Sequence, residues 1–206
     1  GVSYRVAESP NSLFLNCTAA AEIYPKSSFG WNNLGLSRWE LGQTAVALEN
    51  FNRAIEANQS NAEAWNNRSS ALLNLGRYQE AIDSYRMVLS MMGTRGHPKV
   101  LAALEYNLGL ALKQIGKPGE SEQHFRRALQ YDEFDVRVME HLGVTLALLN
   151  RPQEAIAMWQ HALRVNPKHF PAHYNLGLMF AQLGQMNQAA DHMRRVLQLH
   201  PGHSEA

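Results

Sequence analysis

The sequence lacks the features that mark most specialised classes of protein. Its single cysteine, Cys17, excludes an internal disulfide framework and fits a reducing compartment, so a cytoplasmic location is expected. It contains no apolar run of about 18 residues, so we expect no membrane insertion. Charged residues make up 18% of the chain and the net charge is +1, a balance that does not indicate a nucleic-acid binder.

Motifs that carry chemistry are also scarce. We find no Gly-rich phosphate loop, nucleophile elbow or pair of convergent carboxylates, and therefore expect no enzyme activity and no cofactor. Two histidine pairs have a spacing compatible with metal binding, His169 with His173 and His200 with His203. Pro171 interrupts the first pair and no Cys or carboxylate completes a ligand set, so we interpret these side chains as solvated histidines and expect no metal.

What the sequence does contain is a period of 34 residues. Leu-Gly pairs occur at Leu34-Gly35, Leu108-Gly109, Leu142-Gly143 and Leu176-Gly177, and the missing second copy is Arg68-Ser69. A small residue follows each pair by twelve positions, and a bulky residue follows four positions later. The bulky residues are Phe51, Tyr85, Phe125, Trp159 and Met193. This spacing predicts a chain built of repeated units.

Each unit is expected to be helix, tight turn, helix. The residues between the two halves tolerate the left-handed conformation that ends a helix, and they are Gly42, Gly76, Gly116, Asn150 and Gly184. Two antiparallel helices approach closely only where a small side chain faces a large one. We therefore expect Gly35 and Ala47 to make room that Trp31 and Phe51 fill.

The repeated pattern W-x2-LG, A-x3-F-x2-A and a closing Pro resembles the tetratricopeptide repeat (TPR) family. The resemblance implies an all-α fold, a right-handed α-α superhelix (TPR solenoid) of five full repeats plus an N-terminal partial repeat. We expect residues 1–206 to form a single array. Its partial repeat is 1–27, and its full repeats are 28–61, 62–101, 102–135, 136–169 and 170–203.

Two irregularities accompany the array. Six extra residues fall within residues 91–98, where two glycines and a proline disfavour helix and Pro98 is well placed to begin the next one. The chain begins in mid-repeat and stops directly after the fifth repeat, so we expect a segment of a longer protein. The last helix, residues 186–199, is then expected to leave an apolar stripe partly uncovered, allowing self-association through the end helices. That stripe consists of Ala189, Met193 and Val196.

The resemblance also implies a binding surface, because in this family the first helices line a concave groove and the residue before Leu-Gly faces inward. That column reads Asn33, Asn67, Asn107, His141 and Asn175. An amide carries both a donor and an acceptor, so it can pair with the main chain of an extended peptide whatever the peptide's side chains are. The column is similar to the asparagine ladder of O-GlcNAc transferase and of other TPR proteins that bind extended peptides.

Neighbouring positions on the same helices are expected to add specificity. The further candidate contacts are Asn32, Trp39, Asn66, Asn74, Tyr106, Tyr174 and Gln182, and the same face includes Leu36, Ser70, Leu110, Lys113, Glu140, Val144 and Leu178. Two alternatives remain open: some of the amides bond to adjacent helices instead, and Trp39 packs on a helix rather than on a ligand.

Arginines recur on the second helices, at Arg53, Arg86, Arg126, Arg127, Arg194 and Arg195. Acidic residues one turn earlier, at Glu49, Asp83, Glu122 and Asp191, favour a solvated, salt-bridged outer face over contact with nucleic acid or lipid.

These observations favour a protein-interaction scaffold that holds an extended peptide segment of a partner in its groove, within a larger assembly. The alternative is a substrate-recruiting or regulatory arm of an enzyme whose catalytic domain lies outside this segment. A third interpretation is a spacer whose groove stays empty.

Overall fold

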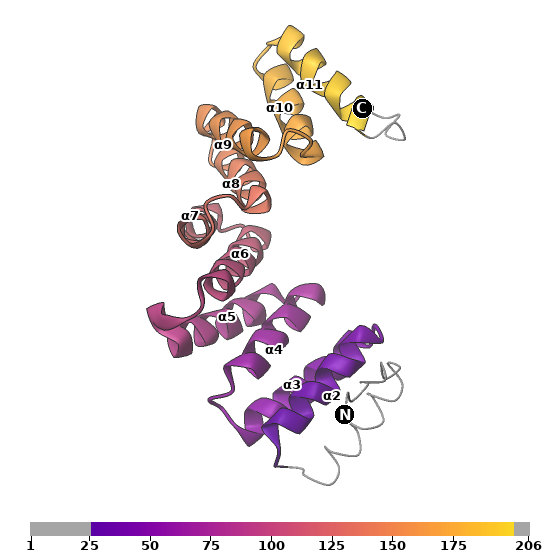
Figure 1. Cartoon of the computed structure of the whole chain (residues 1–206), viewed down its shortest axis with the longest axis vertical. Coiled ribbons are helices and arrows are strands. Elements are labelled where there is room, and N and C mark those ends of the chain that lie inside the picture. Colours follow the sequence, from indigo (N-terminus) through magenta and orange to yellow (C-terminus); the bar gives the residue numbers. More distant parts are fainter. Residues whose placement is uncertain (1–25, 200–206) are drawn as a thin grey trace, which may run out of the picture. The chain divides into compact units, whose positions relative to one another are not determined.

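The computed structural model describes residues 26–199, which form ten α-helices and one short 3-10 helix, η1 (Gly93–Arg95). The α-helices are α2 (Ser28–Glu40), α3 (Thr44–Ala57), α4 (Ala62–Asn74), α5 (Tyr78–Met92), α6 (Pro98–Gln114), α7 (Pro118–Tyr131), α8 (Val136–Leu148), α9 (Pro152–Val165), α10 (Phe170–Gln182) and α11 (Met186–Leu199). They follow one another as helix pairs joined by tight turns (Figure 1). The expected all-α architecture is confirmed. Residues 1–25 and 200–206, with most of the expected partial repeat and the pair His200 and His203, lie outside the described residues.

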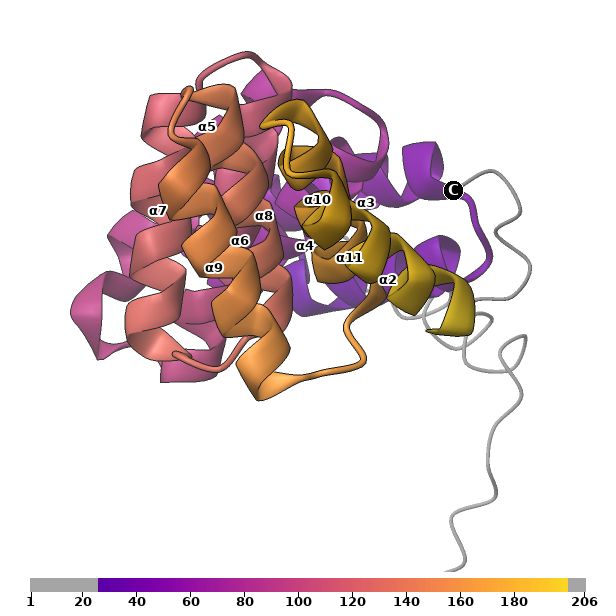
Figure 2. The ribbon, with the colours of Figure 1, turned by 90° about the horizontal axis from the view of Figure 1, so that it is seen from above.

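The chain divides into two compact units, one ending at Gly96 and the other beginning at His97. In each unit a helix packs most closely on its partner in the pair, and the second helix of one pair packs on the first helix of the next. First helices also touch one another, α2 with α4 in the first unit, and α6 with α8 and α8 with α10 in the second. In the second unit α7 and α9 lie on one side of α6 and α8 (Figure 2). The first helices of each unit therefore share a face.

Local sequence explains where the helices begin and turn. The Ser27 side chain accepts a hydrogen bond from the Gly30 amide at 3.1 Å and so caps α2, and proline opens α6, α7 and α9. Four of the five turns place glycine at a φ between 72° and 75°, and the fifth places Asn150 at 57°. These are the turn positions that the sequence predicted.

The close approach within each pair depends on the glycine of the Leu-Gly motif. A Cβ atom added at Gly35 would lie 2.6 Å from Cδ1 of Phe51, and one added at Gly143 would lie 2.6 Å from Cε2 of Trp159. Real Cβ atoms do not come this close to a ring, so the pairs of Gly35 with Phe51 and of Gly143 with Trp159 leave no room for a larger residue than glycine. The prediction that Phe51 fills the space beside Gly35 is confirmed. Trp31 instead packs on a cluster formed by α3 and α4.

The second pair keeps its geometry although Arg68-Ser69 replaces Leu-Gly. Ser69 is fully buried and its hydroxyl donates to the Trp65 carbonyl at 2.6 Å, which satisfies the extra polar atom. The Arg68 guanidinium donates to Asn52 Oδ1 at 2.8 Å and also to the Ser84 hydroxyl. A polar network thus takes the place that leucine occupies elsewhere, and the period is undisturbed.

The insertion between the second and third helix pairs forms the short 3-10 helix η1 and a bend between α5 and α6. Helix α5 extends to Met92, and Gly93 then takes a φ of 54° and opens η1. Helix α6 begins at Pro98, as the sequence predicted. The insertion coincides with the boundary between the two units.

The prediction that α11 leaves an apolar stripe uncovered is wrong for Ala189 and Val196, and Met193 is partly exposed. Ala189 is 7% exposed and Val196 is fully buried, while Met193 packs beside Gly177 of α10. These positions repeat the small-large-small pattern that faces the partner helix, so they are used within the pair. The exposed large apolar side chains of α11 are Met186 and Leu197.

We predict that Gly143→Ala lowers the free energy of unfolding by about 1–3 kcal/mol, because the new methyl group overpacks the Trp159 indole. The matched control is Gly119→Ala, also within a helix, where an added Cβ has nothing within 4 Å. The control should be neutral or stabilising by up to about 1 kcal/mol, since alanine favours helix. Urea unfolding followed by circular dichroism measures both, and equal stability of the two variants would contradict the packing argument.

Candidate functional site

The ladder column lies at one register of the first helices in both units. Asn33 and Asn67 come from α2 and α4, and Asn107, His141 and Asn175 come from α6, α8 and α10. All five side chains are partly exposed. The two units differ in what these side chains bind.

In the first unit the column is closed by an amide pair. Asn67 Nδ2 donates to Asn32 Oδ1 at 2.9 Å, and Asn32 Nδ2 donates to Glu63 Oε1 at 3.1 Å. Asn32 has no exposed surface, so its side chain supports the fold and is not accessible to a ligand. At this pair the alternative of amides that bond to adjacent helices describes the structure.

In the second unit the first and last residues of the column, Asn107 and Asn175, have side-chain amides that bind no other described residue. Within the described part of the chain, neither Asn107 nor Asn175 uses its side-chain amide in a hydrogen bond, so donors and acceptors stay available at these two positions. Between them stands His141, whose ring lies 5.7 Å from the Tyr106 ring and is stacked on Phe125 at 6.1 Å. The histidine thus sits on an aromatic support.

His141 is neutral at pH 7. Burial, together with the nearby charge of Lys113, lowers the pKa of His141 to about 4. The Lys113 ammonium lies 3.3 Å from His141 Nδ1, an arrangement in which a neutral ring nitrogen accepts from the cation. Burial also lowers the pKa of Lys113, and the charge of Glu140 acts in the opposite direction. The Glu140 carboxylate itself lies 3.4 Å from Nε2 of His169.

A pocket of about 300 Å³ lies beside this histidine, between α8 and α10 over the ring of Trp159. It is lined by Val144, Ala147, Leu148, Trp159, Asn175, Leu178, Met179 and Gln182. Trp159 is only 3% exposed, and its indole N–H donates to the Glu140 carbonyl at 3.1 Å, which fixes the ring. The wall of the pocket is mainly apolar and carries no charged side chain. Its two amides are those of Asn175 and Gln182.

The remaining candidates are two aromatic residues that pack on other rings and two asparagines with exposed surface. Trp39 packs edge-to-face on Phe51 with ring centroids 6.1 Å apart, so it packs on the paired helix as the alternative allowed. Tyr174 is 37% exposed and stacks on Phe170. Asn66 is partly exposed, and Asn74 is exposed at the end of α4.

Sequence reasoning missed the floor of the pocket. Trp159 was identified only as the bulky residue opposite Gly143, and that role is confirmed. Its indole is large enough to reach past the glycine to the face of the first helices, where it lines the pocket together with Ala147 and Met179. An indole at a position occupied by phenylalanine, tyrosine or methionine in the other repeats is the signal that could have pointed to it.

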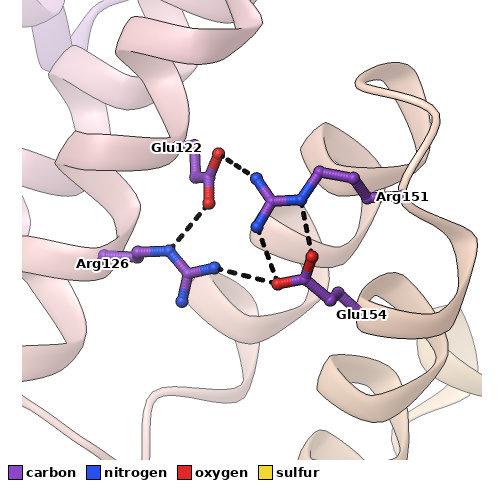
Figure 3. A network of polar contacts seen from close by, with 4 residues as sticks. All are labelled: Glu122, Arg126, Arg151 and Glu154. Carbon is purple, nitrogen blue, oxygen red and sulfur yellow. Dashed lines mark hydrogen bonds and ion pairs between the residues drawn. The ribbon is translucent and has the colours of Figure 1, made fainter.

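The outer helices carry ion pairs, as expected. Arg126 and Arg151 both bind Glu122, at 2.8 and 2.7 Å, and both reach Glu154, at 3.6 and 2.6 Å (Figure 3). Arg194 pairs with Asp191, three positions earlier on the same helix, at 2.6 Å. These arginines already have carboxylate partners, which argues against a free basic stripe.

Neither a metal site nor a membrane-spanning helix is present in residues 26–199. Within that range no group of three or more His, Cys, Asp or Glu side chains could hold a metal ion. His173, one of the spaced histidines, lies with its Nδ1 3.0 Å from Nδ1 of His192 and its Nε2 3.1 Å from the Pro167 carbonyl. No helix in the same range is long and apolar enough to cross a membrane.

We predict that Asn67→Ala lowers the free energy of unfolding by about 1–2 kcal/mol, because the fully buried Asn32 carbonyl loses its donor. Asn66→Ala, the adjacent position on α4, is the matched control with the same change in helix propensity and should have little effect. Chemical unfolding of both variants measures the difference. A stability loss no greater for Asn67→Ala than for the control would show that the amide pair does not support the fold.

We also predict a pH dependence from His141. An unfolded histidine titrates near ~6.5, whereas the folded pKa of His141 is about 4. The unfolded state therefore takes up the proton first as the pH falls, and stability present above about pH 6.5 is lost progressively down to about pH 4, by roughly 1–3 kcal/mol.

The variant His141→Asn, which installs the ladder residue of the other repeats, should lose less stability between pH 7 and pH 4.5 than the wild type. Burial also lowers the pKa of His173 and His192, so both proteins share that part of the slope. Exposed His97→Asn serves as the control. Identical slopes for His141→Asn and the wild type, measured by urea unfolding across this range, would refute the assignment.

Comparison with known proteins agrees with this geometry. The family described as tetratricopeptide repeat matches residues 32–95, 106–159 and 149–204. Tetratricopeptide repeat protein 36 from Danio rerio is 31% identical over 94 residues, which cover 46% of this chain and 49% of that protein, so the match spans about half of the relative's length.

Solved structures share the fold. YrrB, a TPR protein with an unusual peptide-binding site, superimposes with a TM-score of 0.74 at 22% identity over 91% of this chain and 93% of YrrB. MamA from Desulfovibrio magneticus RS-1 gives a TM-score of 0.78 at 21% identity over 86% of this chain and 97% of that structure. The repeat period, the helix pairs and the family match agree, and the chain belongs to the tetratricopeptide repeat family, whose fold serves as a protein-interaction scaffold.

Proposed function

We propose that the second unit binds an extended peptide segment of a partner protein across the first helices α6, α8 and α10. The observation that carries this proposal is the pair Asn107 and Asn175, which occupy the same register, are partly exposed and have no side-chain hydrogen bond within residues 26–199. An unused amide at a repeated position has no role in holding the fold together. Its donor and acceptor match those of a peptide main chain.

The surface between these two amides suits an extended chain. His141 is neutral and presents an aromatic edge, so it adds no competing charge at the middle of the column. The pocket over Trp159 lies one turn along α8 from His141 and can take a side chain that alternates out of the peptide main chain. YrrB, which has this fold, is a TPR protein with a peptide-binding site, so the fold is compatible with this mode.

The first unit has a smaller part in this proposal. Its Asn67 amide is engaged with Asn32, so Asn33 is the one column residue of this unit that makes no side-chain hydrogen bond among the described residues. We therefore assign main-chain recognition chiefly to the second unit. Attachment of the scaffold to a larger assembly would use other surfaces.

The test is a selection of extended peptides on the protein. Peptides of 12 residues are selected from a display library on the 206-residue chain, synthesised with a fluorescein label and measured by fluorescence polarisation. The double variant Asn107→Ala/Asn175→Ala should weaken binding about tenfold, as expected for two lost hydrogen bonds of roughly 0.5–1.5 kcal/mol each. The control Gln130→Ala/Asn187→Ala, at exposed sites on second helices, should bind as the wild type does.

A second readout separates main-chain from side-chain recognition. Methylation of single peptide nitrogens in the selected sequence should weaken binding to the wild type, and this effect should shrink in the double variant. Equal peptide affinity of the wild type and the double variant would place recognition elsewhere on the molecule. Failure to select any peptide above background would refute groove binding as the function.

A further inference from the structure

Lys113 is a cation without a carboxylate partner. It stands in the last turn of α6, partly buried, and its ammonium lies 3.3 Å from Nδ1 of His141. Interaction with the helix dipole accounts for a cation at this end of α6. It does not account for placing the ammonium against the ladder column, where burial disfavours its charge.

Several basic side chains of the second unit are paired, and Lys99, Arg127, Arg164 and Lys168 are exposed to solvent. Arg126 and Arg151 hold Glu122 and Glu154, and Arg137 holds Asp135 at 2.7 Å. Glu140 is the acidic group that acts on Lys113 through space, but its carboxylate oxygens lie 3.4 Å from Nε2 of His169 and 3.9 Å from Nδ1 of His141. Among the described residues, no carboxylate lies within ion-pair distance of Lys113.

The apolar pocket begins about one helical turn along α8 from the histidine that this cation contacts. His141, which contacts Lys113, and Val144, which opens the pocket, are three residues apart on α8, so they share a face about 4.5 Å apart along the helix. The pocket continues to Asn175 and Leu178 on α10. Cation, neutral histidine, apolar pocket and free amide therefore form one strip across three first helices.

The pocket favours one class of side chain. Its volume of about 300 Å³ is at the lower end for small-molecule sites, typically ~300–1,000 Å³, and accommodates a single large side chain. Its wall carries no charge, and Leu178 at its mouth is 42% exposed. A leucine, methionine or phenylalanine side chain would cover that apolar surface.

We propose that the peptide bound by the second unit carries an acidic side chain that pairs with Lys113 and, a few residues away, a large apolar side chain that fills the pocket over Trp159. This inference rests on the proposed function and names the partner segment it selects. The carboxylate is that of an Asp or Glu within the segment. The carboxylate neutralises the charge of Lys113 through a charge-assisted hydrogen bond. The apolar side chain covers the exposed apolar surface of the pocket and so removes it from water.

The test uses defined peptides that differ in one side-chain charge while the label and its charge stay the same. Acetylated, amidated nine-residue peptides of Ser and Ala carry a fluorescein label, one Glu and one Leu, separated by one to four positions in either order. Fluorescence polarisation on the 206-residue chain identifies the best spacing. Replacing Glu by Gln in that peptide should weaken binding roughly tenfold, and replacing Leu by Ser should weaken it by a similar or larger factor.

Matched protein variants assign each effect to its site. Lys113→Met should abolish the preference for Glu over Gln, whereas Lys99→Met, at an exposed position on the same helix, should keep it. Lys113→Arg should retain most of the preference, which guards against a variant that merely folds poorly. Leu178→Asn should reduce the preference for Leu over Ser, while Leu183→Asn, at the nearly equal exposure of 41%, should not.

Each outcome separates the two proposals. Peptide binding that depends on Asn107 and Asn175 but shows the same Glu preference in Lys113→Met and the wild type overturns this inference and leaves the proposed function standing. Equal binding by a peptide with a free C-terminal carboxylate and no Glu assigns Lys113 to a chain terminus and also overturns it. If neither the defined nor the display-selected peptides bind, both proposals fail.

Discussion

The contact between a glycine on the first helix and a large side chain on the second is the constraint on which this structure depends. At Gly35 and Gly143 there is no room for a methyl group beside Phe51 and Trp159, so the two helices of a pair approach until backbone meets ring. This approach sets the rotation of each first helix about its axis. The residue immediately before the Leu-Gly pair consequently has the same orientation in every repeat, and a column of equivalent side chains follows from packing alone.

Equivalent positions acquire different roles because their neighbours differ. Asn67 meets the fully buried Asn32 and becomes part of the framework of the first unit. Asn107 and Asn175 occupy the same register in the second unit and make no side-chain hydrogen bond within residues 26–199, which leaves them available to a ligand. The repeat thus places the amides, and the adjacent side chains determine whether each amide supports the fold or is free for recognition.

Charge is distributed in a way that agrees with this division. On the outer helices Arg126, Arg151, Glu122 and Glu154 neutralise one another in a closed network. Beside the column of the second unit, Lys113 faces a neutral histidine instead of a carboxylate. An ammonium in partly buried surroundings gains more from a carboxylate than a solvated one does, because the local dielectric constant is lower. Within the described residues, Lys113 is therefore a partly buried cation without a carboxylate partner on the face that carries Asn107 and Asn175.

The sequence by itself determined the helix pairs, their turns and the residues that occupy the inner column. These features follow from local rules, since a 34-residue period, left-handed turn residues such as Asn150 and the Gly35–Phe51 match each involve neighbours within one repeat. Only the tertiary structure decided which amides are free, that Ala189 and Val196 are buried, and that Trp159 forms the floor of a pocket. Such properties depend on side chains from several helices meeting at distances that no single-repeat pattern encodes, and on which buried polar atoms find partners there.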